Sequence, residues 1–186
     1  PVKVAQNEQD QFSSYLAYDY FVKGNLAEQS GDLESAAEQY RKALFYDSKS
    51  IEIKRVLSNI YMRQKKYSDA MLIRAEIDNK TADDYTFIGD CLRFTSDIPG
   101  AISYYNQAIK ADSTQYMAHY YLARIYYLMK QYANAEIEYK ALVRYAPDRA
   151  EALLDFGDFS MELNKPDQAF DAYSEAARIN PNDYRA

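Results

Sequence analysis

The 186-residue sequence contains no tryptophan, one cysteine, one histidine, five glycines and five prolines. A single cysteine excludes an internal disulfide framework and a cysteine-rich zinc site, but it does not distinguish a reducing compartment from an oxidising one. No stretch approaches the roughly 18 consecutive apolar residues of a membrane span. Tyrosine, in contrast, occurs 20 times. Because few glycines and prolines leave few turns, this composition indicates long helices with many aromatic packing positions.

The formal net charge of the chain is -6 at pH 7. This balance works against binding of nucleic acid, which depends on Lys and Arg side chains that neutralise phosphates. A protein or a peptide is therefore the expected partner. The chain opens on Pro1 rather than on Met, so we expect a processed chain or a segment, and the compartment stays open between cytoplasm and periplasm.

Small residues recur along the chain with a fixed period. Alanines follow one another at intervals of 34, 31, 34 and 34 residues, at Ala36, Ala70, Ala101, Ala135 and Ala169. Twelve residues before each alanine lies a second small residue: Gly24, Ser58, Gly89, Ala123 and Gly157. Four residues after each alanine comes a large side chain: Tyr40, Arg74, Tyr105, Tyr139 and Tyr173. Since small residues let two helix backbones approach closely, each period predicts one pair of packed helices.

A 34-residue helical pair with these small, aromatic and proline positions resembles the tetratricopeptide repeat family. The resemblance covers residues 17–183 and implies an all-α, right-handed α-solenoid of ten helices. The five implied repeats are 17–50, 51–81, 82–115, 116–149 and 150–183. The second repeat is three residues short, so we expect a shortened second helix or a tight loop near residues 78–84.

The two ends depart from the period. The first half of residues 1–16 is polar and is expected to be loose, whereas Phe12, Tyr15 and Leu16 can extend the first helix backwards. Residues 184–186 resemble the start of another helix, and no polar cap covers the last repeat. Either the natural chain continues, or the uncapped solenoid ends mediate self-association.

Several residues suggest chemistry that the surrounding sequence does not support. A three-residue motif of protein kinases occurs at Asp155, Phe156 and Gly157. The sequence lacks the phosphate-binding loop and the catalytic loop that a kinase also needs. The lone His119 and the lone Cys91 fall at helix-packing positions, without the partners that a metal site or a nucleophile needs. We therefore expect no catalytic residue, no metal and no cofactor, and the protein is not expected to be an enzyme.

The resemblance also implies a binding surface. In this family, positions 2, 5, 9 and 12 of each repeat line the concave groove of the solenoid. The candidate groove residues are Tyr18, Phe21, Asn25, Arg55, Asn59, Asp90, Arg93, Tyr120, Arg124, Tyr127, Leu154 and Asp158. Exposed Tyr and Arg side chains dominate binding energy at protein interfaces, which favours this interpretation. The alternative is that several of these side chains only shield neighbouring repeats.

One subclass of the family holds the carboxylate tail of chaperones with a clamp of Lys, Asn and Arg side chains. Asn25 matches one clamp position, but Phe21, Val56, Asp83 and Phe87 occupy the others. The sequence therefore does not favour chaperone-tail binding.

The leading hypothesis is a noncatalytic scaffold that binds a peptide or a partner domain in the concave groove. The alternative is a regulatory or assembly segment of a larger enzyme or multiprotein complex. The sequence leaves open whether Asp155 and Asp158 make one end of the groove acidic enough to select a basic partner segment.

Overall fold

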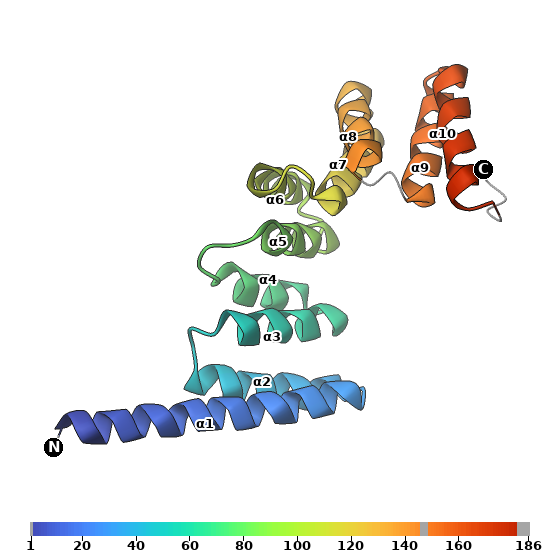
Figure 1. Cartoon of the computed structure of the whole chain (residues 1–186). Helices are drawn as coiled ribbons and strands as arrows, with labels where there is room; N and C mark the ends of the chain where they lie inside the picture. The colour runs from blue at the N-terminus through green and yellow to red at the C-terminus, as the bar shows by residue number, and fades with distance from the viewer. Residues whose placement is uncertain (1, 146–148, 182–186) are drawn as a thin grey trace. The chain divides into compact units, whose positions relative to one another are not determined.

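The computed structural model describes residues 2–145 and 149–181, with side chains from residue 11 onward. These residues form ten helices and no strand (Figure 1). The helices are α1 (Val2–Gln29), α2 (Leu33–Tyr46), α3 (Ile51–Arg63), α4 (Tyr67–Ala75), α5 (Ala82–Phe94), α6 (Ile98–Ala111), α7 (Tyr116–Leu128), α8 (Tyr132–Tyr145), α9 (Ala150–Glu162) and α10 (Pro166–Ile179). None of the described helices is long and apolar enough to cross a membrane. The all-α fold expected from the sequence is confirmed.

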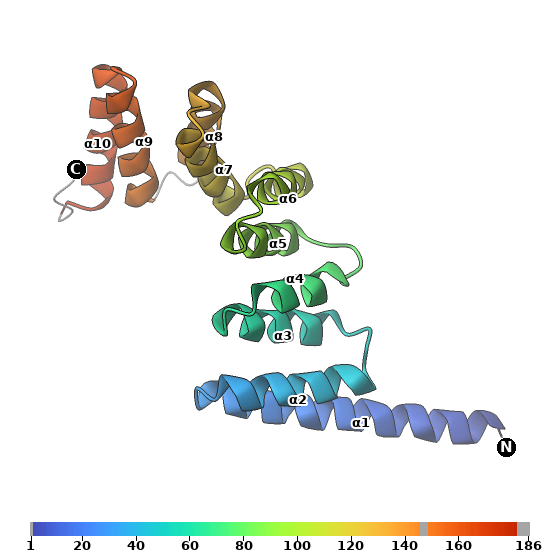
Figure 2. The same cartoon turned by 180° about the vertical axis from the view of Figure 1, so that it is seen from behind.

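The described residues fall into two compact units. The first contains the residues up to Lys80 together with Phe87–Ala101, and the second contains Thr81–Thr86 together with the residues from Ile102 onward. In the first unit α1 packs against α2 and α3 against α4, and in the second α7 packs against α8 and α9 against α10 (Figures 1 and 2). Helices α5 and α6 contribute residues to both units.

The helix starts follow the sequence period. Helices α3, α5, α7 and α9 begin at the residues where the second to fifth implied repeats begin. The second helix of the short repeat, α4, has nine residues, whereas α2 has 14, so the expected shortening is confirmed. At the N-terminus, α1 begins at Val2, and the expectation that the first half of residues 1–16 is loose is wrong. A helix that is already anchored gains one hydrogen bond for each residue it adds, which allows a polar segment to continue it. Residues 184–186 lie outside the described part of the chain.

Small residues mark the helix crossings. All five recurring alanines are buried, as are the five small residues that precede them. At Gly24 a Cβ atom would lie 2.6 Å from the ring of Tyr40, which is itself fully buried. Gly157 lies in the same way under the ring of Tyr173. The glycine therefore leaves space for the tyrosine ring of the second helix. The sequence predicted a close approach of two small residues, whereas at these two glycines the contact is with the tyrosine.

In the second pair, α3 and α4, a charged side chain fills the space at the helix crossing that a tyrosine ring fills in the first pair. Arg74 replaces the tyrosine and is only 5% exposed. Its Nε atom donates to Ser58 Oγ at 2.8 Å, and its Nη2 atom donates to Asn59 Oδ1 at 2.6 Å. The guanidinium also lies over the ring of Phe87, 3.9 Å from the centroid. A buried cation is tolerated because these polar groups and the aromatic face compensate for its lost hydration.

Each of five helix turns uses one residue with left-handed backbone. These residues are Gly31, Lys65, Ser96, Lys130 and Asn164, with φ values of 82°, 61°, 65°, 59° and 57°. At Lys130, the backbone N–H bonds the Tyr127 carbonyl at 2.9 Å and the next N–H bonds the Tyr126 carbonyl at 2.8 Å. This pair of bonds is a Schellman motif, which satisfies the last carbonyls of a helix. Only Gly31 adopts this conformation without a steric cost from a Cβ atom.

The left-handed turns yield a stability prediction. Lys130 is exposed, so Lys130→Gly should raise the free energy of unfolding by about 1 kcal/mol, because glycine removes the cost of left-handed backbone. Gly31→Ala should lower it by a similar amount. Urea unfolding followed by far-UV circular dichroism measures both changes. A less stable Lys130→Gly variant would contradict this account.

His119 is buried on α7, where both ring nitrogens face acceptors. Nδ1 lies 2.6 Å from Glu138 Oε2, and Nε2 lies 3.1 Å from the Ser113 carbonyl oxygen. Burial by itself lowers the pKa of His119. The hydrogen bonds to the Glu138 carboxylate and the Ser113 carbonyl, together with the charge of Glu138, outweigh burial and raise the pKa above the ordinary 6.5. Since both ring nitrogens face acceptors, this arrangement favours the doubly protonated ring, which can donate to both.

A pH dependence of stability follows from the raised pKa of His119. A group whose folded pKa exceeds its unfolded value contributes stability below the unfolded pKa and loses it as the pH rises through the folded pKa. Stability should therefore fall as the pH rises above 6.5, and this fall should be smaller in His119→Gln. Because the chain has one histidine, its ring signals can be titrated alone by nuclear magnetic resonance (NMR). A pKa at or below 6.5 would refute the prediction.

Candidate interaction surfaces

In the first unit, a hollow lies between α1 and the start of α3. Its volume is about 220 Å³, which is below the roughly 300 Å³ at which small-molecule sites begin. Tyr18 and Phe21 line it together with Asp47, Ser50 and Glu52. Tyr18 is 68% exposed, whereas Phe21 is half-buried against the core of this unit. The structure therefore brings together the two aromatic residues that the sequence assigned to this end of the groove.

Two other candidate groove residues hold their own helix pair. Asn25 Oδ1 accepts a hydrogen bond from the Tyr40 hydroxyl at 2.5 Å. Asn59 Oδ1 accepts from Arg74. Both amides thus bind the large side chain of the second helix, and the structure does not place them in the α1–α3 hollow.

The remaining candidates of the first unit also make local contacts. Arg55 is half-buried, and its backbone carbonyl accepts a hydrogen bond from the Ser58 hydroxyl at 2.9 Å. Asp90 and Arg93 form an ion pair of 3.3 Å along α5. The Arg93 guanidinium lies over the ring of Phe94, 4.3 Å from its centroid.

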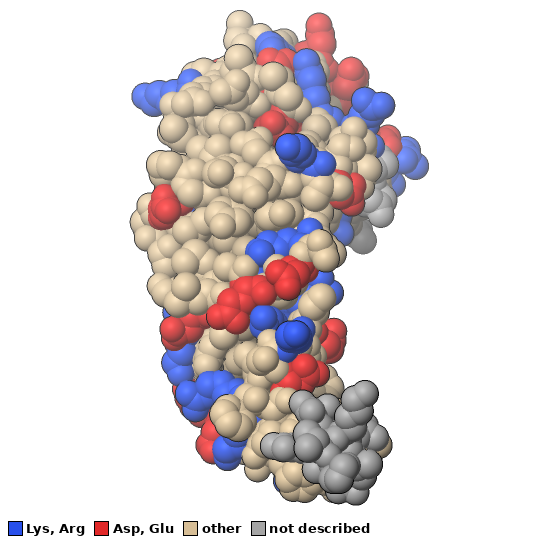
Figure 3. All heavy atoms as spheres, turned by 90° about the vertical axis from the view of Figure 1, so that its left-hand side faces the viewer, with Lys and Arg blue, Asp and Glu red and all other residues tan. Residues whose placement is uncertain are grey.

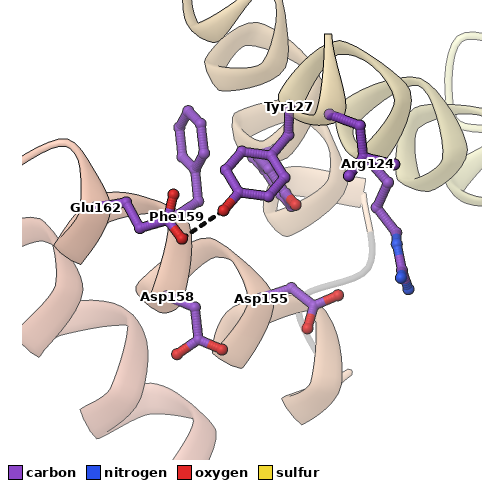
Figure 4. A pocket seen from close by; sticks show the side chains of 8 residues that line it. Arg124, Tyr127, Asp155, Asp158, Phe159 and Glu162 are labelled. Carbon is purple, nitrogen blue, oxygen red and sulfur yellow. Dashed lines mark hydrogen bonds between the residues drawn. The ribbon is translucent and has the colours of Figure 1, made fainter. Parts of the chain in front are cut away.

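In the second unit, a pocket of about 300 Å³ lies between α7 and α9 (Figure 4). We call it the α7–α9 pocket; it is lined by Arg124, Tyr127, Leu128, Tyr139, Asp155, Asp158, Phe159 and Glu162. Three of these, Arg124, Tyr127 and Asp158, are candidate groove residues. The analysis of groove positions missed Tyr139 and Glu162. The spacing of Asp155, Asp158 and Glu162, three and four residues apart, places them on one helix face and was the available signal.

Two tyrosines, Tyr127 of the pocket and Tyr173 on α10, donate hydrogen bonds to carboxylates of this pocket. The Tyr127 hydroxyl donates to Glu162, and this bond, followed by burial, raises the pKa of Tyr127 to about 12. The Tyr173 hydroxyl donates to Asp158 Oδ1 at 2.7 Å. Burial and this bond raise the pKa of Tyr173 to about 12. Both tyrosines therefore stay protonated at neutral pH and act as donors.

Tyr120 lies at a second hollow of the same unit, of about 450 Å³. Met117, Leu142 and Glu151 also line it. The hydroxyl of Tyr120 accepts a hydrogen bond of 2.5 Å from Arg124 Nη1.

Leu154 differs from the other candidates because it is fully buried. It packs in a cluster with Leu153 and Ala176, on the side of α9 that faces α10. Its side chain therefore offers no surface to a partner.

The residues with suggestive chemistry lie in structural positions. Phe156 is buried in a core cluster, and Gly157 lies under the Tyr173 ring. Cys91 is buried, and burial raises the pKa of its thiol to about 12, so it carries no thiolate at neutral pH. Among residues with described side chains, no group of three or more His, Cys, Asp and Glu residues is arranged to hold a metal ion.

The chain matches two tetratricopeptide repeat models. One matches residues 21–83 and 129–184, and the other matches residues 96–154. No curated protein sequence matches the chain.

Solved structures with the same fold include three proteins. MamA has 21% sequence identity and a TM-score of 0.77, with coverage of 89% of this chain and 92% of MamA. YrrB, described as a TPR protein with an unusual peptide-binding site, has 20% identity and a TM-score of 0.68, with coverage of 98% and 93%. PilF of Pseudomonas aeruginosa has 17% identity and a TM-score of 0.71, with coverage of 97% and 96%. At these identities the similarity establishes the fold alone.

Residues, helix pairs and comparisons agree on one family. The model that matches residues 21–83 and 129–184 covers more than half of the chain. The chain therefore belongs to the tetratricopeptide repeat family, whose members generally act as noncatalytic scaffolds for protein interactions.

Proposed function

We propose that this protein is a noncatalytic scaffold that binds a peptide or a segment of a partner protein along the first helices of its repeats. The observation that carries the proposal is the recurrence of a hollow between the first helices of neighbouring pairs. One lies between α1 and α3, and the hollow at Tyr120 occupies the corresponding place between α7 and α9. The α7–α9 pocket lies further along the same two helices. Each of the two hollows contains aromatic side chains, Tyr18 and Phe21 in the α1–α3 hollow and Tyr120 in the hollow between α7 and α9.

The residue types in these hollows support binding. Tyr18 is largely exposed, and Tyr127 and Arg124 line the α7–α9 pocket. Tyrosine and arginine are enriched among the residues that dominate the energy of protein interfaces, because they combine apolar area with directed hydrogen bonds. The description of YrrB as having a peptide-binding site offers a precedent within the same fold.

Charged side chains do not by themselves define a binding region. On the face in Figure 3, basic and acidic side chains lie next to one another, and uncharged side chains cover a broad area between them. Selectivity is therefore expected from local hollows rather than from the net charge.

Two exposed aromatic residues of the first unit test the proposal. Tyr18 lines the α1–α3 hollow, whereas Phe45 on α2 is 80% exposed and lines no described hollow. Peptides selected from a random displayed library on the full chain should bind Tyr18→Ala about tenfold more weakly, because an interface anchor is lost. Phe45→Ala should leave their affinity unchanged. Fluorescence anisotropy of labelled peptides measures both.

Three results would count against the proposal. The library could yield no binding peptide, or the selected peptides could bind Tyr18→Ala as tightly as the original chain. Equal losses in Tyr18→Ala and Phe45→Ala would show that any exposed aromatic residue suffices, and the hollow would then have no special role.

A further inference from the structure

In the first and the last helix pair, the tyrosine of the second helix is hydrogen-bonded to the first helix. The Tyr40 hydroxyl lies 2.5 Å from Asn25 Oδ1 and 3.0 Å from Glu28 Oε2. In the last pair, Tyr173 donates to Asp158 Oδ1 at 2.7 Å. These tyrosines thus bury their rings and satisfy their hydroxyls within the pair.

Tyr139 on α8 departs from this arrangement. It is 4% exposed and lines the α7–α9 pocket, and its hydroxyl has no hydrogen-bond partner among the residues that the structure describes. The repeat offers no acceptor here, since Arg124 stands where α1 has Asn25, and Tyr127 stands where α1 has Glu28. The hydroxyl is not among the buried side-chain atoms that lack a partner, so it is accessible from the pocket, and a polar group from outside the chain can bond it there.

Carboxylates line the α9 wall of this pocket. Asp155, Asp158 and Glu162 project from α9 (Figure 4). Against these three formal negative charges the pocket has one positive charge, Arg124. The hydrogen bond to the Tyr120 hydroxyl and, more weakly, the charge of Asp155 raise the pKa of Arg124 above its usual range. The pocket is therefore negatively charged and favours a cation.

The walls of the pocket are aromatic. The rings of Tyr139 and Phe159 lie 4.9 Å apart between centroids, and those of Tyr127 and Phe159 lie 6.1 Å apart. Ring faces attract cations and also pack against methylene groups. A volume of about 300 Å³ is at the lower end of ligand sites and suits a single side chain.

We infer that the α7–α9 pocket binds a basic side chain, lysine or arginine, of a partner polypeptide. The cationic head lies among the carboxylates of Asp155, Asp158 and Glu162, and its N–H groups donate to them and to the Tyr139 hydroxyl oxygen. The methylene stem packs on the aromatic walls. This inference rests on the proposed function, because it names the chemistry of a partner segment that the scaffold would hold.

The pocket can be probed without a known partner. The probe is N-acetyl-lysine methylamide, titrated into the full ¹⁵N-labelled chain and followed by amide chemical shifts. Its control is the same molecule with the side-chain amine acetylated, which removes the charge and keeps the stem. We expect saturable shifts in α7, α8 and α9 with a Kd on the order of 1 mM, and at least tenfold weaker binding of the neutral control. N-acetyl-arginine methylamide serves as the second cationic probe.

Variants connect the shifts to the pocket. Asp155→Asn combined with Asp158→Asn should weaken binding of the cationic probes about tenfold, since asparagine keeps an acceptor and loses the charge. The matched control combines Asp167→Asn with Asp171→Asn, two exposed carboxylates of α10 outside the pocket, with the same change in net charge. This control should bind the probes as the original chain does.

Tyr139→Phe isolates the hydroxyl. It should weaken binding while leaving the urea unfolding midpoint unchanged or higher, because the hydroxyl has no partner in the free protein. Tyr40→Phe, which removes a bonded hydroxyl, should lower the midpoint. If Tyr139→Phe binds the cationic probes as tightly as the original chain, the hydroxyl does not contribute to binding.

The outcomes separate this inference from the proposed function. Absence of shifts in α7, α8 and α9 with both cationic probes, or equal shifts with the neutral control, would overturn the basic-side-chain pocket even if library peptides bind the chain. Conversely, a library that yields no peptide would refute the scaffold proposal, while saturable lysine binding at the pocket would still stand.

Discussion

The close crossing of two helices, with a small residue of the first under a large side chain of the second, underlies the packing of this protein. Gly24 leaves no room for a Cβ atom because the buried Tyr40 ring occupies that space. In the next pair Arg74 fills the corresponding space and Ser58 supplies an acceptor for it. The crossing therefore tolerates a change of chemistry, provided that volume and hydrogen bonding change together.

The same crossing limits which side chains remain available to a partner. Asn25 and Asn59 stand on the expected groove face, yet each bonds the large side chain of its own pair. Where Arg124 takes this position, the bond to the second helix is missing, and Tyr139 keeps an unpaired hydroxyl. The break in the repeated interaction coincides with the carboxylate-lined α7–α9 pocket, so the proposed binding feature lies where the structural pattern is interrupted.

The sequence predicted the helix pairs well because burial repeats with a fixed period. The small residues at the crossings, the short α4 and the structural role of Phe156 and Gly157 all followed from that period. Other features carry no periodic signal. Helix α1 continues through a polar segment, because each residue added to a formed helix gains a hydrogen bond, and the left-handed turns accept Lys130 as well as Gly31.

The candidate surface was predictable by position but not by availability. Helical spacing places Leu154 and Asp158 on a common stripe, although only packing against α10 buries Leu154. His119 likewise reveals its charged role only through Glu138 and the Ser113 carbonyl, which approach it in three dimensions. The sequence by itself determined the repeat, the helix pairs and the residues at each crossing, since these depend on local periodicity and side-chain volume. Tertiary structure decided which hydroxyls and carboxylates line the α7–α9 pocket, because that depends on distances between helices that sequence spacing does not contain.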